Sequence, residues 1–341
     1  MKRVLAVRLD SLGDVVMAGP AVRAIATRAE PFLLTGPRGA AAARLLPHVQ
    51  HVSEWDCPWI GNPAAEASPR HLRRLERLIT DIAPDEAVIF TSFHQSPLPL
   101  ALELRLCGVP RITALSEDYP GSLIDVRVTT RQLPWSVHEV DRALGIAAAA
   151  GFSLPADDDG LPALAPQRHS GIRPTGAYVV VHPGADAPAR AWPAEHCAAL
   201  VELLAATGMQ VVVTGGPDER ALTARVAGSQ GIDLGGRTSL PALVDLLEGA
   251  SVVVAGNTGP AHLAAATRTP VVSLFAPVVP PGVWKPRGAP VVVLGDQTAA
   301  CSGTRARICP IPGHPCLSDV RAEHVLTAVR ELLGAETGAV A

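Results

Sequence analysis

Lysine is almost absent from this sequence of 341 residues. It occurs only at Lys2 and Lys285, so arginine supplies the other positive charges. The formal net charge is −3, and a chain with this balance has no bulk positive charge to attract nucleic acid. Aromatic residues make up only 4%, which leaves few rings on which single-stranded bases could stack. We therefore expect no nucleic-acid partner.

Long apolar runs are also absent. No run reaches the roughly 20 residues that a membrane-spanning helix needs. The first seven residues resemble the start of a signal peptide, but Arg8 and Asp10 interrupt the apolar region. We expect a monomeric cytoplasmic protein that touches the inner face of the membrane at most peripherally. Its six cysteines should then remain thiols, because the cytoplasm is reducing.

The sequence offers no clear metal site. It contains no H-E-x-x-H or C-x-x-C pattern, and the aspartates at 157–159 lie in a flexible stretch where their side chains would not converge on one ion. One loop carries four residues of the types that bind zinc: Cys301, Cys309, His314 and Cys316. The separations between these cysteines are unusual for a zinc site, so zinc stays an alternative there. We expect no metal and no other cofactor.

Short β-branched runs alternate with helical stretches in two halves of the chain. Strands are expected at 3–9, 32–35, 49–55, 86–90 and 111–114, and then at 177–181, 210–214, 252–254, 271–275 and 291–294. Helices are expected at 15–29, 39–46, 69–82 and 98–107, and then at 194–207, 218–227, 240–248, 260–267 and 319–333. Such alternation indicates βαβ units and parallel sheets.

A stretch rich in Pro, Asp, Gly and Ala separates the two halves. We predict an N-terminal domain at 1–155, a linker at 156–174 and a C-terminal domain at 175–341. The last helix is expected to have Ser318 as its N-cap, and it could pack back on the N-terminal domain.

The strongest candidate site follows the run of valines at 252–254. Gly256 and Gly259 allow a tight turn, and Thr258 is a good N-cap for a helix that carries His262. The unpaired amides at a helix N-terminus and the helix dipole both favour a negative charge. This stretch therefore predicts a phosphate site, although an ordinary strand–helix turn would give the same pattern.

Two further stretches of the second half end strands at the same predicted edge. His182-Pro-Gly184 precedes Arg190, a fixed cation that could hold a diphosphate without a metal. Thr214 ends another strand, and Glu219 behind it could accept hydrogen bonds from the two hydroxyls of a ribose. Together these residues predict a nucleotide site.

The first half has its own candidate site where strands end. Asp14 lies between a strand and a helix, so it is either a helix cap or a catalytic group. His94 follows the strand at 86–90 and is a candidate ligand contact. The helix at 69–82 has a face rich in arginine, which is either solvated or in contact with an anionic acceptor or a membrane surface.

Three stretches, at 11–14, 182–193 and 257–262, resemble glycosyltransferase family 9, the ADP-heptose:lipopolysaccharide heptosyltransferase family, over nearly the whole chain. The resemblance implies an α/β fold of GT-B architecture, with two Rossmann-like domains facing each other across a cleft. It implies that the N-terminal domain binds the acceptor and the C-terminal domain binds the nucleotide-sugar. It also implies inversion at the anomeric carbon without a metal ion.

The resemblance carries roles onto individual residues. Asp14 matches the proposed general base, and Arg190 takes the place of a cation that contacts the donor. Glu219 matches the acid on the ribose, with looser spacing. Asn257 departs from the family, which commonly has Asp there, so the identity of the sugar stays open. The remaining donor-side residues are Gly184, Thr214, Thr258, Gly259 and His262, and the acceptor-side residues are Ser11, Gly13, His94 and Gln95.

The predicted protein is thus a metal-independent inverting glycosyltransferase. It would move a heptose or a related sugar from a nucleoside-diphosphate donor, with ADP expected, to a hydroxyl group. The acceptor would be a glycan, a glycolipid or a small molecule. Two alternatives remain at this point: a GT-B enzyme similar to nucleotide-sugar 2-epimerases, and a nucleotide-sugar-binding protein without activity.

Overall fold

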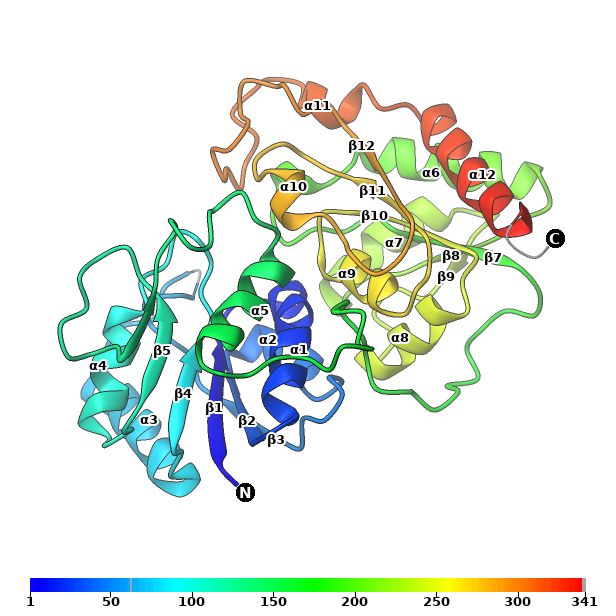
Figure 1. Cartoon of the computed structure of the whole chain (residues 1–341). Helices are drawn as coiled ribbons and strands as arrows, with labels where there is room; N and C mark the ends of the chain where they lie inside the picture. The colour runs from blue at the N-terminus through cyan, green and yellow to red at the C-terminus, as the bar shows by residue number, and fades with distance from the viewer. Residues whose placement is uncertain (62, 339–341) are drawn as a thin grey trace. The chain divides into compact units, whose positions relative to one another are not determined.

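The computed structural model describes residues 1–61 and 63–338, and it divides into two compact units (Figure 1). The first unit is Met1–Ala165 and the second is Pro166–Ala341. The division falls inside the segment at 156–174 that the composition indicates as a linker. Among the described residues, no helix is long and apolar enough to cross a bilayer.

The first unit is built on a parallel sheet of six described strands in the order β3-β2-β1-β4-β5-β6. The strands are β1 (Arg3–Arg8), β2 (Glu30–Thr35), β3 (His51–Glu54), β4 (Glu86–Ile89), β5 (Ile112–Leu115) and β6 (Val126–Val128). The chain runs outward from β1 to β3 and then returns, so that β4 pairs with β1. The strand order therefore reverses between β1 and β4, which is where ligands bind in open α/β sheets.

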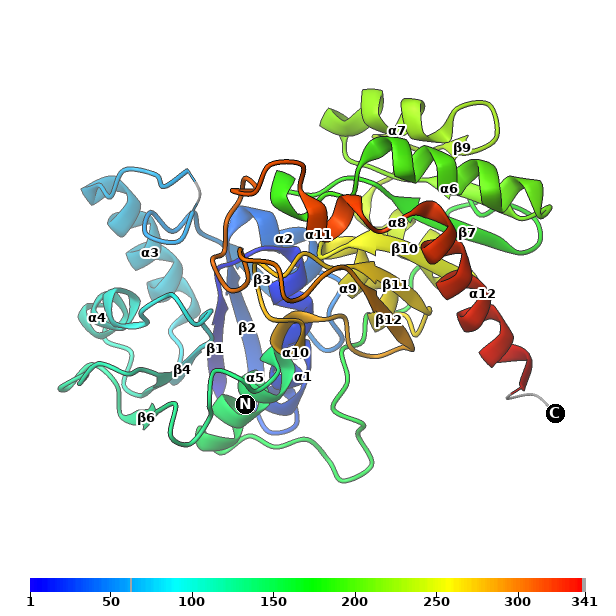
Figure 2. The same cartoon turned by 90° about the horizontal axis from the view of Figure 1, so that it is seen from above.

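Helices cover both faces of this sheet (Figures 1 and 2). They are α1 (Leu12–Ala26), α2 (Pro37–Ala43), α3 (Pro69–Ile82), α4 (Leu98–Leu106) and α5 (Glu139–Ala149). One face carries α1, α2 and α5, while α3 and α4 lie side by side on the other. Leu75 and Ile79 of α3 and Leu104 of α4 pack with Ile89 of the sheet in one buried core.

The second unit repeats the plan with the strand order β12-β11-β10-β7-β8-β9. The strands are β7 (Tyr178–His182), β8 (Gln210–Val213), β9 (Ile232–Asp233), β10 (Val252–Gly256), β11 (Val271–Leu274) and β12 (Val291–Leu294). Strands β7 and β10 pair in parallel, with Ala255 opposite His182. The order reverses between them, so their carboxyl ends form the switch point of this unit.

The helices of the second unit are α6 (Ala194–Ala206), α7 (Arg220–Ala227), α8 (Leu240–Glu248), α9 (Gly259–Ala266), α10 (Pro281–Trp284), α11 (Pro315–Ser318) and α12 (Ala322–Gly338). Two short 3-10 helices, η1 (Pro188–Arg190) and η2 (Pro217–Glu219), follow β7 and β8. Helix α6 packs against α7 and α12, and α8 packs against α9.

The end of the chain differs from the prediction. Ser318 is not the N-cap of the last helix, because it ends α11 and its hydroxyl donates to the carbonyls of Gly313 and His314. The last helix, α12, begins at Ala322. Its buried residue Val329 lies in the core of the second unit.

Six elements were not predicted from the sequence: the short helices η1, α10 and α11, the helix α5, and the strands β6 and β9. Strand β9 has only two residues and β6 has three, so neither shows a recognisable alternation. Helix α5 begins after His138, whose ring accepts a hydrogen bond from the Val140 amide, and histidine is not a usual cap signal.

Candidate functional site

Asp14 lies in the first turn of α1, directly behind the carboxyl end of β1. Its Oδ2 accepts hydrogen bonds from the Ser11 amide (3.1 Å) and the Ser11 hydroxyl (2.6 Å). Asp14 therefore caps the helix through one carboxylate oxygen. The other oxygen, Oδ1, accepts a hydrogen bond from Arg8 at 3.2 Å. The side chain is 16% exposed, so solvent still reaches it.

Arg8, the last residue of β1, organises a group of carboxylates around itself. Its guanidinium is 3% exposed and forms ion pairs with Asp10 (2.9 Å), Asp14 (3.2 Å) and Glu139 (3.1 Å). It also donates to the Ser92 hydroxyl at 3.0 Å. A buried cation at the end of a strand needs such partners, because an unpaired charge there would lose its hydration without compensation.

Glu139 extends this network to a second buried cation. It begins α5, is 3% exposed, and forms an ion pair with Arg142 as well as with Arg8. Burial is the main cause that lowers the pKa of Arg142, to about 10, and repulsion from Arg8 adds to it. Arg142 still carries its proton at neutral pH, so Glu139 pairs with two buried cations.

Asp10 and Gln95 connect the ends of β1 and β4. Gln95 donates from Nε2 to Oδ1 of Asp10, and its Oε1 accepts from the Ser92 amide (3.1 Å). Burial raises the pKa of Asp10, and the attraction of Arg8 opposes that shift. The structure thus brings the predicted residues Ser11, Asp14 and Gln95 together with Asp10, which was not predicted as a site residue.

The other two predicted residues of this unit, His94 and Gly13, differ in their exposure. The His94 side chain is exposed, and its ring meets the Phe93 ring edge-on, with centroids 5.5 Å apart. Gly13 is buried in α1. Arg8 and Glu139 were not predicted as site residues from the sequence. Arg8 could have been found from the sequence, because a charged residue at the end of an apolar strand requires buried partners. Nothing in the sequence indicated Glu139.

In the second unit, the turn after β10 lies against the loop that carries Arg190. A Cβ atom on Gly256 would lie 2.7 Å from the carbonyl oxygen of Arg190, so only glycine fits there. Asn257 and His262 are each 6% exposed, and both flank the start of α9. The predicted residues Arg190, Asn257 and Thr258 are therefore close in space, at the end of β10.

Thr258 is the N-cap residue of α9, but its side chain does not cap the helix. Its backbone is extended (φ −142, ψ 168), and its hydroxyl donates back to the carbonyl of Gly256 at 3.5 Å instead of capping the first turn. The hydroxyl thus leaves the first-turn amides of α9 to other partners. An N-terminus of this kind favours an anion through its amides and its dipole.

The ends of β7 and β8 meet at Glu219. Its Oε2 accepts from the Gly216 amide at 2.7 Å, and a Cβ atom on Gly184 would lie 1.8 Å from its Oε1. The His182 ring and the Thr214 hydroxyl also hold each other in place, because Nδ1 of His182 lies 3.0 Å from that hydroxyl. The structure therefore brings Gly184, Thr214 and Glu219 together, and it adds His182 to the predicted set.

Burial lowers the pKa of His182, and the nearby charge of Glu219 opposes this shift. The imidazole is therefore neutral at pH 7. A neutral ring beside Thr214 and Glu219 offers both a hydrogen-bond donor and an acceptor.

The cysteine loop does not form a cluster of metal ligands. Among the described residues, no group of three or more His, Cys, Asp or Glu side chains could hold a metal ion. Cys301 and Cys316 are buried in the apolar core, while Cys309 donates to the carbonyl of Ile311 and the His314 ring lies 3.1 Å from the carbonyl of Ala189.

The fold and these polar groups define a class of protein. Two parallel α/β units, each with polar side chains at the switch point of its sheet, are the architecture of GT-B glycosyltransferases. The family model of glycosyltransferase family 9 (heptosyltransferase) matches residues 104–313, which is more than half of the chain. The chain belongs to this family and is a glycosyltransferase.

Relatives with established names agree with this assignment. The chain is 28% identical to lipopolysaccharide heptosyltransferase 1 of Pseudomonas aeruginosa, over 96% of this chain and 94% of that protein. It is 26% identical to lipopolysaccharide heptosyltransferase 2 of Escherichia coli, over 82% of this chain and 84% of that protein.

Solved structures share the fold. The E. coli ADP-heptose LPS heptosyltransferase II has a TM-score of 0.70 at 20% identity, with 99% of this chain and 100% of that chain covered. A glycosyl transferase of family 9 from Veillonella parvula has a TM-score of 0.74 at 18% identity, with 97% of each chain covered. These likenesses confirm the predicted α/β fold of GT-B architecture.

Proposed function

We propose that the enzyme transfers a heptose or a related sugar from an ADP-linked donor to a hydroxyl of a lipopolysaccharide-type glycolipid. Transfer would invert the anomeric carbon and would need no metal ion. The observation that carries this proposal is the position of Asp14, a carboxylate held by Arg8 and Ser11 at the switch point of the first sheet. The names of the relatives, which are lipopolysaccharide heptosyltransferases, support the sugar and the acceptor.

The reaction we propose is a single displacement. Asp14 accepts the proton of the acceptor hydroxyl while that oxygen forms a bond to the anomeric carbon of the donor. The bond between that carbon and the diphosphate oxygen breaks on the opposite face, and the nucleoside diphosphate leaves with the electron pair. General-base assistance of this kind contributes roughly 10²–10⁴-fold to the rate. Arg8 and Ser11 would keep the carboxylate in one orientation before the substrate arrives.

The second unit would bind the donor. The first-turn amides of α9 and the Arg190 guanidinium would stabilise the charge that develops on the departing diphosphate. The Glu219 carboxylate, fixed over Gly184, would accept hydrogen bonds from the ribose hydroxyls. ADP is the proposed nucleotide because solved heptosyltransferases of this fold include E. coli WaaC with ADP and with ADP-2-deoxy-2-fluoro heptose.

Asn257 bears on the sugar. It is buried at the end of β10, and an amide there can donate hydrogen bonds as well as accept them. A carboxylate, which the family commonly has at this position, only accepts. The proposed sugar is therefore a heptose or a related sugar, and the proposal does not specify a single isomer.

The experiment supplies the enzyme with ADP-heptose and a heptose-deficient lipopolysaccharide acceptor. We expect release of ADP together with a mass increase of the acceptor by one sugar residue. Release of ADP without any change in the acceptor would contradict transfer to this acceptor class, and binding of ADP-heptose without turnover would contradict transfer from this donor. A parallel reaction with UDP- and GDP-linked sugars tests the choice of nucleobase.

A further inference from the structure

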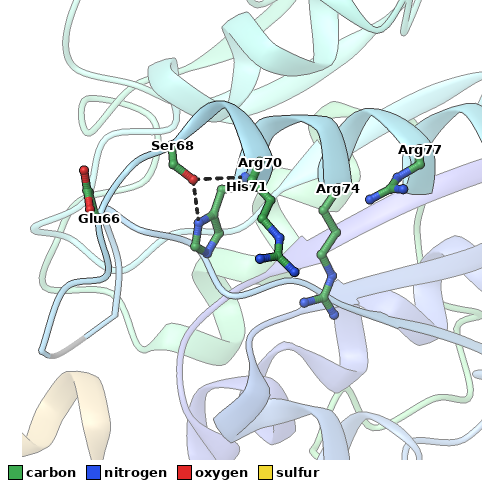
Figure 3. A pocket seen from close by; sticks show the side chains of 6 residues that line it. All are labelled: Glu66, Ser68, Arg70, His71, Arg74 and Arg77. Carbon is green, nitrogen blue, oxygen red and sulfur yellow. Dashed lines mark hydrogen bonds between the residues drawn. The ribbon is translucent and has the colours of Figure 1, made fainter.

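Helix α3 carries the arginine-rich face that the sequence predicts, and this face borders a pocket of about 460 Å³. Six residues line the pocket: Glu66, Ser68, Arg70, His71, Arg74 and Arg77 (Figure 3). Its three arginines are exposed, so water hydrates their charges. The pocket therefore agrees with a solvated charged face, which is one of the alternatives for this helix.

The cysteine loop, by contrast, contacts the donor side of the second unit. It runs from the end of β12 to the start of α11 (Figure 1). Two of its residues, Arg307 and His314, reach the segment 186–190, which ends in Arg190. Because Arg190 is the cation proposed for the donor diphosphate, these contacts bear on nucleotide binding.

Ala189, the residue before Arg190, has both of its backbone groups held by this loop. Its amide donates to the carbonyl of Arg307 at 2.9 Å, and its carbonyl lies 3.1 Å from Nε2 of His314. A carbonyl oxygen only accepts hydrogen bonds, so Nε2 of His314 carries the proton in this contact. Ala189 is 1% exposed, so the loss of either bond would leave a buried backbone group unpaired.

Arg307 also fixes the start of the segment. Its Nη2 donates to the backbone carbonyl of Asp186 at 2.8 Å, and its Nη1 lies 3.3 Å from the Asp186 carboxylate. Both side chains are exposed, so the ion pair itself contributes little to stability. The hydrogen bond to the backbone is the contact that defines where the segment begins.

The segment depends on such contacts because its own structure is short. Pro188–Arg190 forms η1, and a 3-10 helix of three residues has poor hydrogen-bond geometry. The carbonyl of Arg190 lies against the turn after β10, where a Cβ on Gly256 would be 2.7 Å from it. The Arg190 backbone therefore contacts this turn, while the residue before it is bonded to the cysteine loop.

The cysteine loop is itself anchored to the unit. The amides of Gly303 and Arg305 donate to the carbonyls of Pro277 and Val278 at 2.9 and 2.8 Å. His314 has a left-handed backbone (φ 51), which costs energy in a residue other than glycine, so its surroundings must hold it there. Helix α11 does so, because the amide of the buried Leu317 donates to the His314 carbonyl at 3.2 Å.

We propose that Arg307 and His314 are positioning residues for donor binding. They hold the segment 186–190 in the conformation that directs Arg190 toward the diphosphate. The inference rests on the proposed function, in which Arg190 contacts that diphosphate. A cation that is positioned before the ligand arrives lowers the ordering cost of binding, so the loss of either residue should weaken the affinity for the nucleotide.

The test measures ADP binding to the full-length enzyme by calorimetric titration. His314→Leu removes the donor to Ala189, whereas His314→Gln keeps an N–H group near the position of Nε2. Both replacements meet the same left-handed backbone, so the hydrogen bond is the main difference between them. We expect His314→Leu to bind ADP about fivefold more weakly than the wild type, and His314→Gln to recover most of this affinity.

Arg307→Met is the second variant, and its exposed position keeps the cost in stability small. It should weaken ADP binding by about threefold, because one hydrogen bond to the segment is lost. Its control is Arg225→Met, which breaks another exposed ion pair of the same unit, with Glu195 at 3.4 Å. Both variants remove one positive charge, so only its position differs. The control for His314→Leu is His324→Leu, at an exposed position of α12.

A double variant shows whether His314 acts through Arg190. In the Arg190→Ala background, His314→Leu should cause no further loss of ADP affinity, because the cation that it positions is gone. Hydrogen exchange of the segment 186–192 without ADP is a second measurement. Exchange should be faster in His314→Leu than in the wild type and in His324→Leu, since one contact of the segment is missing.

Three results would overturn the proposal. One is ADP binding by His314→Leu and Arg307→Met that equals that of their controls while Arg190→Ala binds weakly, a result that leaves the proposed function intact. Another is an equal loss of affinity from His314→Leu with and without Arg190, which would assign His314 only to the stability of the unit. The third is unchanged ADP affinity in Arg190→Ala, which would also overturn the donor role of Arg190 in the proposed function.

Discussion

The Arg8 guanidinium donates to Oδ1 of Asp14 at 3.2 Å, and the same guanidinium pairs with Glu139 at 3.1 Å. The candidate base therefore belongs to a buried network that joins the end of β1 to the start of α5. Such a network fixes the direction of the carboxylate, and it makes the stability of the first unit depend on the same cation.

Arg8→Met tests this dependence. The variant removes the buried cation that pairs with the carboxylates of Asp10 and Glu139. We expect the free energy of unfolding to fall by about 3–5 kcal/mol, because carboxylates are left buried without this partner. Denaturant unfolding of the wild type and the variant measures the difference. The control is Arg28→Met, an exposed arginine whose replacement should change stability by no more than about 0.5 kcal/mol. A loss for Arg8→Met as small as that of the control would contradict the network.

Gly184 and Gly256 give a paired prediction for the second unit. A Cβ on Gly184 meets the carboxylate of Glu219, which can move, so Gly184→Ala should weaken ADP binding by about tenfold or more with a small loss of stability. A Cβ on Gly256 meets the backbone oxygen of Arg190, which cannot move easily, so Gly256→Ala should cost about 1–3 kcal/mol of stability. Calorimetric titration and thermal melting separate the two effects.

The control for both is Gly282→Ala, where no atom lies within 4 Å of the added Cβ. If Gly184→Ala binds ADP as tightly as this control does, Glu219 has no part in nucleotide binding.

The role of Arg190 leads to a prediction about metals. ADP should bind in the presence of EDTA with unchanged affinity, and Arg190→Ala should weaken it by about 1.5–3 kcal/mol, the range for a hydrogen bond to a charged group. The chelation must also cover iron, since one solved protein of this fold, the heptosyltransferase TibC of E. coli, is iron-containing. Loss of ADP binding on chelation would contradict metal-independent binding.

His182 gives a dependence of stability on pH. Burial holds its folded-state pKa below the ordinary value of 6.5, so the unfolded chain takes up this proton first as the pH falls. The wild type should lose stability relative to His182→Gln from about pH 6.5 downward, by up to about 1.4 kcal/mol per pH unit. Above pH 7.5 the difference should be constant. Urea unfolding at a series of pH values measures it, and a constant difference down to pH 5 would contradict the buried neutral ring.

How far the sequence alone predicts the molecule depends on the range of the interactions involved. Helix α8 (Leu240–Glu248) and strand β12 (Val291–Leu294) were predicted with their observed bounds, because the hydrophobic patterns that mark them are local signals. The donor-side residues come from strand ends, whose common edge follows from the parallel topology.

The partners of Arg8 could not be predicted in this way. Asp10 is a near neighbour in the sequence, but Glu139 reaches Arg8 only through the packing of α5 against α1. No local pattern records that packing, and α5 itself has many alanines and an unusual cap at His138. The environment of the candidate base was therefore the part that required the structure.

The last prediction concerns Asp14 itself, which caps α1 with one oxygen and faces Arg8 with the other. Asp14→Asn keeps the shape and an oxygen that can accept the cap hydrogen bond, but it removes the proton acceptor. If Asp14 is the general base, kcat should fall by roughly 10²–10⁴-fold while the affinity for ADP stays near that of the wild type. The melting temperature should fall only slightly, because Asp10 and Glu139 still pair with Arg8. The control is Asp118→Asn, the same change at an exposed position of the first unit. A folded Asp14→Asn enzyme whose turnover stays within a few-fold of that control would show that Asp14 is only a cap, and His94 would be the next residue to test as the base.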